Sequence, residues 1–290
     1  MKTSNNSVSG RGVCGCLSWV VAVGVCGSLA GCDNGTEPPS ERRLVVEGRI
    51  DSGGYPEVYL TLSAAADEAG GSLSGNVVRW GVVRVSDGDE EVILTGGPKN
   101  GVFPPFSYYS FDMKGVAGKS YTLKADWDGM SVCSTVRMPE PTAIDEVRVE
   151  RVAGSEEGRN LTLVFRSPDD CPAYYHVSTR VSGRDSRFYP SMPGAIAVTE
   201  GGKIVEMPVY KGRRLLGDAD DNGMFLAGER VIVRLERVSA DVFAFWRAWD
   251  NASLVEGSVF VGAPGSLPGN VAGGYGVWSA QGVDSMDVDL

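Results

Sequence analysis

Short apolar runs separated by turn residues recur along most of this chain. Residues 51–54 and 128–129, for example, are aspartate, serine and glycine between runs rich in valine, leucine and aromatic residues. Such residues tolerate the backbone angles of tight turns, and apolar runs of this length are typical of β-strands. The pattern predicts strands at 44–50, 55–62, 77–85, 91–94, 107–111, 121–127 and 131–138. About seven short strands predict an N-terminal β-sandwich of the immunoglobulin-like or transthyretin-like kind over residues 44–138.

Two prolines mark a boundary after this predicted sandwich. Pro139 and Pro141 lack the backbone N–H that a sheet ladder needs, so residues 139–147 are expected to be a linker and the first strand of a second domain. That C-terminal domain, residues 148–290, is also β-rich. The further predicted strands are 144–152, 161–166, 174–181, 195–198, 203–209 and 230–237.

The predicted strand at 230–237 shows the clearest alternation of apolar and charged positions. Val231 and Leu235 belong to its apolar set, whereas Arg234 and Glu236 fall on the opposite face. Successive side chains of a strand point to opposite sides of a sheet. We therefore expect one face of this strand to contact a core and the other face to be polar.

One segment of the second domain has the pattern of a helix. Ser239 is a helix-capping residue, and apolar residues follow it at helical spacing. Four of them share one face: Val242, Phe245, Trp246 and Trp249. We expect this face to cover a sheet as part of the core, with a ligand-binding aromatic stripe as the alternative. The predicted fold class is therefore mainly β, with one short helix in the second β-rich domain.

Residues 1–31 have the pattern of a secretory signal. Lys2 and Arg11 are their only charges, and an apolar stretch that is short for a stable membrane span leads to Leu29-Ala-Gly-Cys32. Small residues before a cysteine suit the lipoprotein signal peptidase, and the cysteine thiol accepts a diacylglycerol. We expect cleavage before Cys32 and lipidation of its sulfur, with an ordinary signal peptide or an uncleaved anchor as the alternatives.

Lipidation of Cys32 predicts a protein of the cell envelope, anchored in the outer membrane by acyl chains and facing the periplasm or the surface. Residues 32–43 are polar and contain prolines, the composition of a flexible tether. The signal holds two of the 27 basic residues and no acidic one, so the remaining chain has 25 basic and 37 acidic residues, a formal charge of −12. This balance disfavours nucleic acid as a partner.

Only Cys133 and Cys171 remain as thiols once the signal and Cys32 are set aside. An oxidising envelope permits a disulfide between them. Cys133 lies in a predicted strand and Cys171 in a predicted turn, so the sequence does not give their separation. Pairing and two free thiols both stay open.

The sharpest local motif is an acidic loop at 218–229. Its residues satisfy the spacing of a calcium-binding loop, in which oxygen ligands surround a single ion. The candidate ligands are Asp218, Asp220, Asn222, the backbone carbonyl of Met224, and Glu229. An EF-hand needs flanking helices, whereas 230–237 has the pattern of a strand. Ca²⁺ is therefore the one candidate cofactor, with an acidic, solvated turn as the alternative.

Catalytic motifs are sparse in this sequence. His176 is the only histidine, and a nucleophilic dyad with Cys171 would require a turn to fold back onto its face. The sequence has no Gly-x-Ser-x-Gly motif, no paired histidines for zinc and no phosphate-binding glycine loop. Adjacent carboxylates such as Asp169 and Asp170 lie in turn-like sequence and are expected to face solvent. We do not expect an enzyme; the alternative is a surface glycan hydrolase with paired carboxylates.

Aromatic residues cluster around two prolines at 103–111. Four of them form a candidate recognition surface for a glycan or a partner: Phe103, Phe106, Tyr108 and Tyr109. A strand whose alternate rings point into a core explains the same residues, and we favour that interpretation. The glycine-rich run at 268–278 likewise allows close backbone approach, either to another strand or to a partner.

Five stretches follow one another in order behind the lipidation motif. They are Leu44-Val-Val-Glu-Gly-Arg-Ile50, Gly118-Lys-Ser-Tyr-Thr-Leu-Lys124, Pro141-Thr-Ala-Ile-Asp-Glu146, the segment from Gly228 through the helix of Trp246, and Leu267-Pro-Gly-Asn-Val-Ala-Gly-Gly-Tyr-Gly-Val-Trp278. In this order they resemble a family of Bacteroidota outer-envelope lipoproteins catalogued as domain of unknown function 4249. The resemblance implies an outer-envelope location and association with a TonB-dependent receptor, and it implies no catalytic residues.

The sequence thus predicts a lipid-anchored outer-membrane lipoprotein. Its expected role is that of a non-catalytic accessory or binding subunit beside a TonB-dependent transporter, as the resemblance implies. A glycan hydrolase and a structural envelope or adhesin module are the competing interpretations. The sequence does not identify a ligand.

Overall fold

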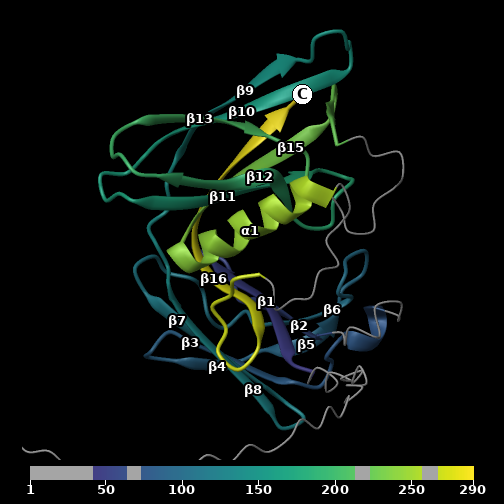
Figure 1. The fold of residues 1–290 in the computed structure, drawn as a ribbon, viewed down its shortest axis with the longest axis vertical. Coiled ribbons are helices and arrows are strands. Elements are labelled where there is room, and N and C mark those ends of the chain that lie inside the picture. The colour runs from purple at the N-terminus through teal and green to yellow at the C-terminus, as the bar shows by residue number, and fades with distance from the viewer. Residues whose placement is uncertain (1–41, 64–72, 213–222, 257–266) are drawn as a thin grey trace, which may run out of the picture. The chain divides into compact units, whose positions relative to one another are not determined.

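A computed structural model describes residues 42–63, 73–212, 223–256 and 267–290 (Figure 1). Within them the chain is mainly β with a single α-helix, so the predicted fold class is confirmed. Four residues of the predicted sites lie outside the described ranges: Cys32, Asp218, Asp220 and Asn222.

The largest sheet has eight strands, and we call it the central sheet. Its strands in spatial order are β12 (Tyr189–Val198), β11 (Ala173–Val181), β15 (Arg230–Val238), β16 (Tyr275–Asp289), β1 (Leu44–Asp51), β2 (Glu57–Leu62), β6 (Phe106–Tyr109) and β5 (Thr95–Pro98). Because non-consecutive strands are neighbours in this sheet, residues far apart in the sequence meet on its faces.

Two four-stranded sheets complete the β-structure of the described residues. One has the order β4 (Glu91–Ile93), β3 (Val82–Ser86), β7 (Ser120–Trp127) and β8 (Met130–Arg137). The other has the order β13 (Ile204–Val209), β10 (Gly158–Arg166) and β14 (Phe225–Leu226), with β9 (Ile144–Arg151) also paired with β10. A short 3₁₀ helix, η2 (Leu73–Asn76), and the helix α1 (Ala240–Glu256) are the remaining elements.

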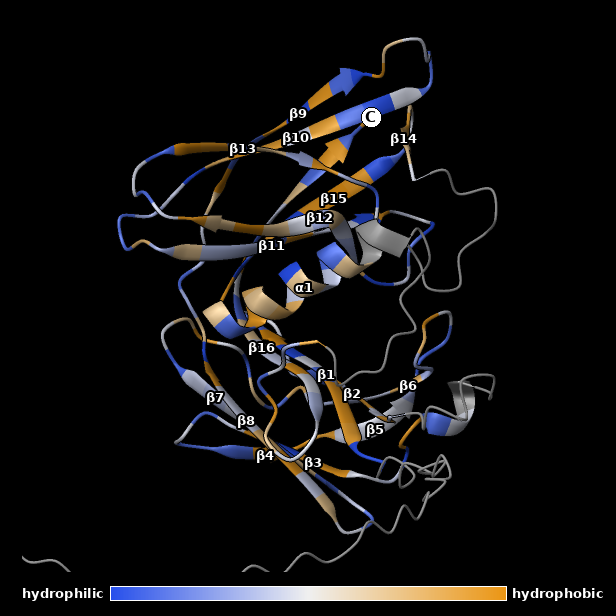
Figure 2. Cartoon of the chain, viewed as in Figure 1, coloured by the Kyte–Doolittle hydropathy of each residue, from blue (hydrophilic) through white to orange (hydrophobic). Residues whose placement is uncertain are grey.

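The first hydrophobic core lies between the β1 half of the central sheet and the sheet that contains β7. Strand β7 shows how the sequence builds it, because Tyr121, Leu123 and Ala125 are fully buried while Lys124 between them is exposed. This period of two is the alternation that the sequence predicts. Figure 2 shows the same alternation of apolar and polar residues along the strands.

The second hydrophobic core lies between the β15 half of the central sheet and the sheet that contains β10. It includes Leu163 and Phe165 of β10, Tyr175 of β11, and Val233 and Leu235 of β15. The predicted apolar face of 230–237 is therefore confirmed.

Strand β16 takes part in both halves of the fold. Residues 275–281 pair with β1 in parallel, and residues 282–289 pair with β15 in antiparallel register. Trp278 is fully buried in the first core, where its Nε1 donates a hydrogen bond to the carbonyl oxygen of Tyr121 at 3.0 Å. The structure thus differs from the expectation that residues 148–290 make a domain of their own, because their last strand also completes the N-terminal sandwich.

Glycines make room for β16 in its crowded position. Gly276 has a φ of 99°, and a Cβ there would lie 1.9 Å from the carbonyl oxygen of Val46. A Cβ on Gly282 would lie 2.5 Å from the carbonyl oxygen of Pro139. Since real side chains never come so close to backbone, only glycine fits. The glycine-rich C-terminal run therefore serves close approach to another strand, which is one of its two predicted roles.

Helix α1 begins at the predicted cap. The backbone N–H of Val242 donates to Ser239 Oγ at 3.4 Å. Near the other end of the helix, Asp250 Oδ2 accepts hydrogen bonds from the backbone N–H groups of Gly194 and Ala195 in β12, both at 2.9 Å. These bonds hold the helix alongside β12, as Figure 1 shows.

The buried face of α1 differs in part from the predicted one. Val242 is fully buried as expected, and Phe243 is buried beside it. Phe245, Trp246 and Trp249 are only half-buried. Their rings contact one another, with centroids 5.3 to 6.5 Å apart, and Phe245 and Trp246 also pack against the buried residues beneath the helix. The helix is thus amphipathic, but its aromatic residues lie at the margin of the core.

Candidate functional site

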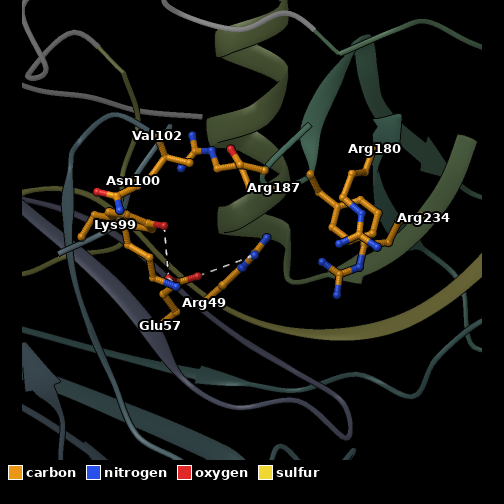
Figure 3. A pocket seen from close by; sticks show the side chains of 11 residues that line it. Arg49, Glu57, Lys99, Asn100, Val102, Arg180, Arg187 and Arg234 are labelled. Carbon is orange, nitrogen blue, oxygen red and sulfur yellow. Dashed lines mark hydrogen bonds and ion pairs between the residues drawn. The ribbon is translucent and has the colours of Figure 1, made fainter. Parts of the chain in front are cut away.

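The central sheet carries charged residues on the face that points away from both cores. In β1, Val46 and Ile50 enter the first core, whereas Arg49 between them points to the other side. Arg234 of β15 and Arg180 of β11 likewise alternate with core residues. These three arginines line a cavity of about 230 Å³ over the middle of the sheet (Figure 3).

Two loops form the walls of this cavity. Lys99 comes from the connection between β5 and β6, and Arg187 from the connection between β11 and β12. Ser186 Oγ donates a hydrogen bond to the carbonyl oxygen of Gly101 at 3.1 Å, which joins the two loops. We call the cavity the cationic pocket, because five basic side chains line it: Arg49, Lys99, Arg180, Arg187 and Arg234.

Among the described residues, Glu57 is the only carboxylate that lines the cationic pocket. Lys99 Nζ lies 2.8 Å from Glu57 Oε1, and Arg49 Nη2 lies 3.8 Å from Oε2 (Figure 3). The hydroxyl of Ser107 also donates to this carboxylate, at 3.1 Å. Burial opposes ionisation of Glu57, but these hydrogen bonds and positive charges outweigh it and lower the pKa. Glu57 is therefore a carboxylate at neutral pH, and its negative charge compensates positive charge on Lys99 and Arg49.

A second carboxylate, Asp51, holds Arg234 from the sheet side. The two form a hydrogen-bonded ion pair, and Gln281 Nε2 donates to the other oxygen of Asp51 at 2.9 Å. Gln281 is opposite Asp51 in the parallel ladder between β16 and β1. The side chain of Arg234 is only 12% exposed, and its Nη1 atom has no hydrogen-bond partner among the described residues.

Behind the pocket, Glu236 is buried beside His176. His176 Nδ1 lies 2.7 Å from one oxygen of Glu236, and Ser178 Oγ donates to the other at 2.7 Å. Burial opposes the charge on Glu236, but the contacts with His176, Arg234 and Ser178 outweigh it and lower the pKa to about 2. The imidazole ring stacks on Trp246 of α1, with ring centroids 4.0 Å apart. His176 thus lies under the helix as part of a buried polar network.

Arg187 lies between a carboxylate and two tyrosine rings. Its Nη1 atom is 3.2 Å from Glu47 Oε1, and its guanidinium lies 5.6 Å and 5.5 Å from the ring centroids of Tyr59 and Tyr189. Glu47 raises the pKa of Arg187, and this outweighs the opposing effect of burial. Burial, together with the nearby charge of Glu57, raises the pKa of Tyr59 to about 12. Arg187 and Tyr59 therefore keep their protons at any physiological pH.

The ring of Phe188 contacts the guanidinium groups of Arg180 and Arg234. The guanidinium of Arg234 lies 4.4 Å from its ring centroid and that of Arg180 lies 5.0 Å from it. Such cation–π contacts orient a guanidinium without neutralising it. Arg180 has no carboxylate within ion-pair distance in the part of the chain that the structure describes, so its charge is uncompensated.

The described end of the predicted calcium loop already holds a cation. The buried ammonium of Lys211 lies 2.7 Å from Glu229 Oε1 and donates to the carbonyl oxygen of Met224 at 3.1 Å. The other oxygen of Glu229 accepts a hydrogen bond from the backbone N–H of Leu226 at 2.9 Å. The remaining predicted ligands lie outside the described residues. Within the described ranges, no three histidine, cysteine, aspartate or glutamate side chains gather as a metal site.

We expect calcium to leave the melting temperature of this protein unchanged, because the Lys211 ammonium takes the oxygens of Glu229 and Met224 that the ion would need. Calorimetry with calcium and with EDTA tests this, with Glu229→Ala as the comparison. If calcium raises the melting temperature of the wild type and Glu229→Ala abolishes this rise, the result would contradict the expectation and support a calcium site.

The predicted aromatic surface is divided between the core and the surface. Phe106 and Tyr108 pack in the first core, and the Tyr108 hydroxyl donates to the carbonyl oxygen of Val78 at 3.0 Å. Phe103 and Tyr109 are half-buried. Tyr108 is therefore unavailable to a ligand, because it is buried in the core, whereas Phe106 is half-buried against that core. Tyr109 stays at the surface, with Lys99 Nζ 5.6 Å from its ring centroid.

The two remaining cysteines are free thiols. Cys133 lies in β8 and Cys171 packs against the second core, so they belong to different halves of the fold. The predicted alternative of a disulfide is not what the structure shows. Cys171 and His176 also do not form a dyad, since His176 points toward Glu236 and Trp246 on the other face of the central sheet.

A second, more open cavity of about 450 Å³ lies over β10 and β13. Its lining includes Lys211 and Gly223, which border residues outside the described ranges, so the cationic pocket is the better-defined site.

In the described segments, no helix has the length and apolar character that a membrane span requires.

The cationic pocket is the site that sequence reasoning missed. The sequence places Arg234 on the polar face of its strand, but the pattern in one strand does not say which other strands lie beside it. One feature of the sequence could have indicated the pocket. Charged residues alternate with core residues on several strands, such as Glu47, Arg49 and Asp51 in β1.

Comparison with known proteins places the chain in a family. No curated protein gives a significant match. The family described as domain of unknown function DUF4249 matches residues 34–287, nearly the whole chain after the predicted signal. The chain therefore belongs to the DUF4249 family.

Proposed function

We propose that this protein is a lipid-anchored lipoprotein of the outer membrane and acts as a non-catalytic binding subunit beside a TonB-dependent transporter. The cationic pocket is the observation that carries the binding role, because it is a walled cavity lined by charged side chains that hydrogen bonds and ring contacts hold in place. The anchor rests on the lipidation motif that ends at Cys32. The partner and the Bacteroidota source rest on the family resemblance.

The lining of the pocket favours binding over hydrolysis. Glycoside hydrolases of the common kind use two carboxylates about 5 to 10 Å apart, one of them protonated as an acid. Among the residues that line the cationic pocket, Glu57 is the one carboxylate, and Lys99 and Arg49 hold it in its ionised form. A group held so firmly as an anion is a poor proton donor.

The anchor is tested by fractionation of cells that express Cys32→Ser. We expect the wild type in the membrane fraction with an acylated N-terminal peptide by mass spectrometry, because the acyl chains supply its attachment. Cys32→Ser should appear in the aqueous fraction, while Cys133→Ser, which changes a cysteine of the folded part, should stay with the membrane. An unmodified N-terminal peptide from wild-type protein in the aqueous extract would contradict the anchor.

The partner is tested by affinity purification from detergent-solubilised outer membranes. We expect a TonB-dependent receptor to be recovered with the tagged chain and to be absent when the tag is on an unrelated outer-membrane lipoprotein. Repeated recovery of the chain without a receptor would contradict the accessory role and would favour a structural envelope module.

A further inference from the structure

We propose that the cationic pocket binds a small organic anion, with Arg180 as the principal partner of the ligand's carboxylate or phosphate group. The proposal deepens the proposed function, because it names the ligand class of the same pocket. It rests on the charge balance of the pocket, on the unpaired guanidinium of Arg180 and one unpartnered nitrogen of Arg234, and on the size and lining of the cavity.

The charges around the pocket leave one cation in excess. In the part of the chain that the structure describes, four carboxylates approach its five basic side chains: Glu47 beside Arg187, Asp51 beside Arg234, Glu57 beside Arg49 and Lys99, and Glu236 behind Arg234. Three of these carboxylates are not among the described residues that line the cavity: Glu47, Asp51 and Glu236. They compensate its cations from positions in strands β1 and β15 of the central sheet. The cation left over is Arg180.

Arg180 is therefore available to an incoming anion. It contacts the ring of Phe188 but has no ion pair within the described residues. An arginine cannot lose its proton in a protein, so its charge persists whether or not a partner is present. Its guanidinium presents parallel N–H donors, which match the two oxygens of a carboxylate or phosphate. An anion at this position would supply the charge that the chain itself does not.

Arg234 provides a second donor toward the same ligand. Its Nη2 atom donates to Asp51, but the buried Nη1 atom has no hydrogen-bond partner among the described residues. Buried N–H groups in native proteins almost always have partners, so an unsatisfied one on a side chain that lines the cavity favours an acceptor there. Glu236 Oε1 lies 3.8 Å from Arg234 Nη1, too far for a hydrogen bond.

The volume and the partly apolar lining of the cavity favour a small organic molecule as the ligand. The cavity volume of about 230 Å³ is below the about 300 to 1,000 Å³ of typical ligand sites. Tyr59, Val102 and Phe188 line it together with the basic residues and offer apolar surface to the uncharged part of a ligand. Long polyanions are disfavoured, because the chain as a whole has a formal charge of −10.

Three sugars of the same ring size test the proposal. Glucose, glucuronate and glucose-6-phosphate differ mainly at one carbon, which carries a hydroxyl, a carboxylate or a phosphate. We expect isothermal titration of the full lipidated chain in detergent to show binding of at least one of the two anions and none of glucose. The anion that binds more tightly identifies the group that the pocket prefers. Added salt should weaken the binding, because it screens the charges.

Arg180→Gln tests the residue that carries the proposal. The substitution breaks no ion pair among the described residues, so the chain should fold normally. We expect the affinity for the anion to fall about tenfold, the effect of losing one hydrogen bond between charged groups. The matched control is Arg151→Gln, which removes the same charge from an exposed position in β9 and should leave the affinity unchanged.

Three results would overturn the proposal. They are equal binding of glucose and the anions, no binding of either anion, or an equal loss of affinity in Arg180→Gln and Arg151→Gln. Because the titration uses purified protein, it is independent of the purification that tests the transporter partner. Failure here with a receptor still recovered would leave the proposed function in place and remove only the anionic ligand class.

Discussion

Glu236→Ala should lower the free energy of unfolding by about 3 to 5 kcal/mol, the usual cost of removing one partner of a buried charged pair. Glu236 is only 4% exposed, and His176, Ser178 and Arg234 all surround its carboxylate. Its removal leaves the hydroxyl of Ser178 without its acceptor and Arg234 without one of its two carboxylates. Urea unfolding followed by circular dichroism measures the loss.

Glu206→Ala is the matched control for this prediction. Glu206 also lies in a strand and pairs with an arginine, Arg148, but both side chains are exposed. Exposed ion pairs contribute little, so the control should unfold at nearly the urea concentration of the wild type. If Glu236→Ala were no less stable than Glu206→Ala, the network behind the pocket would not support the fold.

The same carboxylate predicts a pH dependence. The pKa of Glu236 falls from the ordinary 4.5 to about 2 in the folded protein, because the contacts with its partners outweigh the effect of burial. A lowered pKa means that the unfolded chain binds the proton more readily. The contribution of Glu236 is therefore fully present above about pH 4.5 and is lost as the pH falls toward about 2. Glu236→Gln should show a smaller loss of stability across this interval than the wild type.

Trp278→Ala should destabilise the protein by about 3 to 5 kcal/mol, the range measured when a large buried side chain is cut back to alanine. Trp278 is fully buried in the first core and donates its indole hydrogen to Tyr121, although it lies near the end of the chain. The mutation removes the large side chain that β16 contributes to the first core. Hydrogen exchange should therefore accelerate in β1 and β7 as well as in β16.

Trp80→Ala is the comparison for this substitution. The side chain of Trp80 is 88% exposed, so its removal opens no cavity and should change stability by no more than about 0.5 kcal/mol. Circular dichroism is the suitable probe, because both variants alter tryptophan fluorescence. Faster exchange confined to β16 and its neighbour β15 would show that β16 does not support the N-terminal sandwich.

The sequence predicted most strands of this fold because burial alternates along each of them. The predicted strand at 121–127 corresponds to β7, and the helix starts after the predicted cap Ser239. Local pattern was insufficient for β5, whose sequence Thr-Gly-Gly-Pro has only one residue typical of strands, Thr95. It was also insufficient for β16, whose glycines resemble a loop until the crowding by β1 explains them.

The candidate site could not be assembled from the sequence, because its residues meet only through the order of strands in the central sheet. Arg234 and Asp51 form an ion pair although 183 positions separate them. The sequence does show that Arg234 points away from the core, but it cannot show that β16 brings β15 next to β1. The calcium motif illustrates the converse, since a complete local pattern did not anticipate the ammonium of Lys211 at Glu229.

A crystal structure of the protein grown with the tighter-binding of glucuronate and glucose-6-phosphate is the most direct test of the cationic pocket as a ligand site. We predict electron density for the anion inside the pocket, with its charged group in contact with Arg180. A pocket that contains only solvent at a saturating concentration of the anion, or an anion bound elsewhere on the protein, would contradict the account.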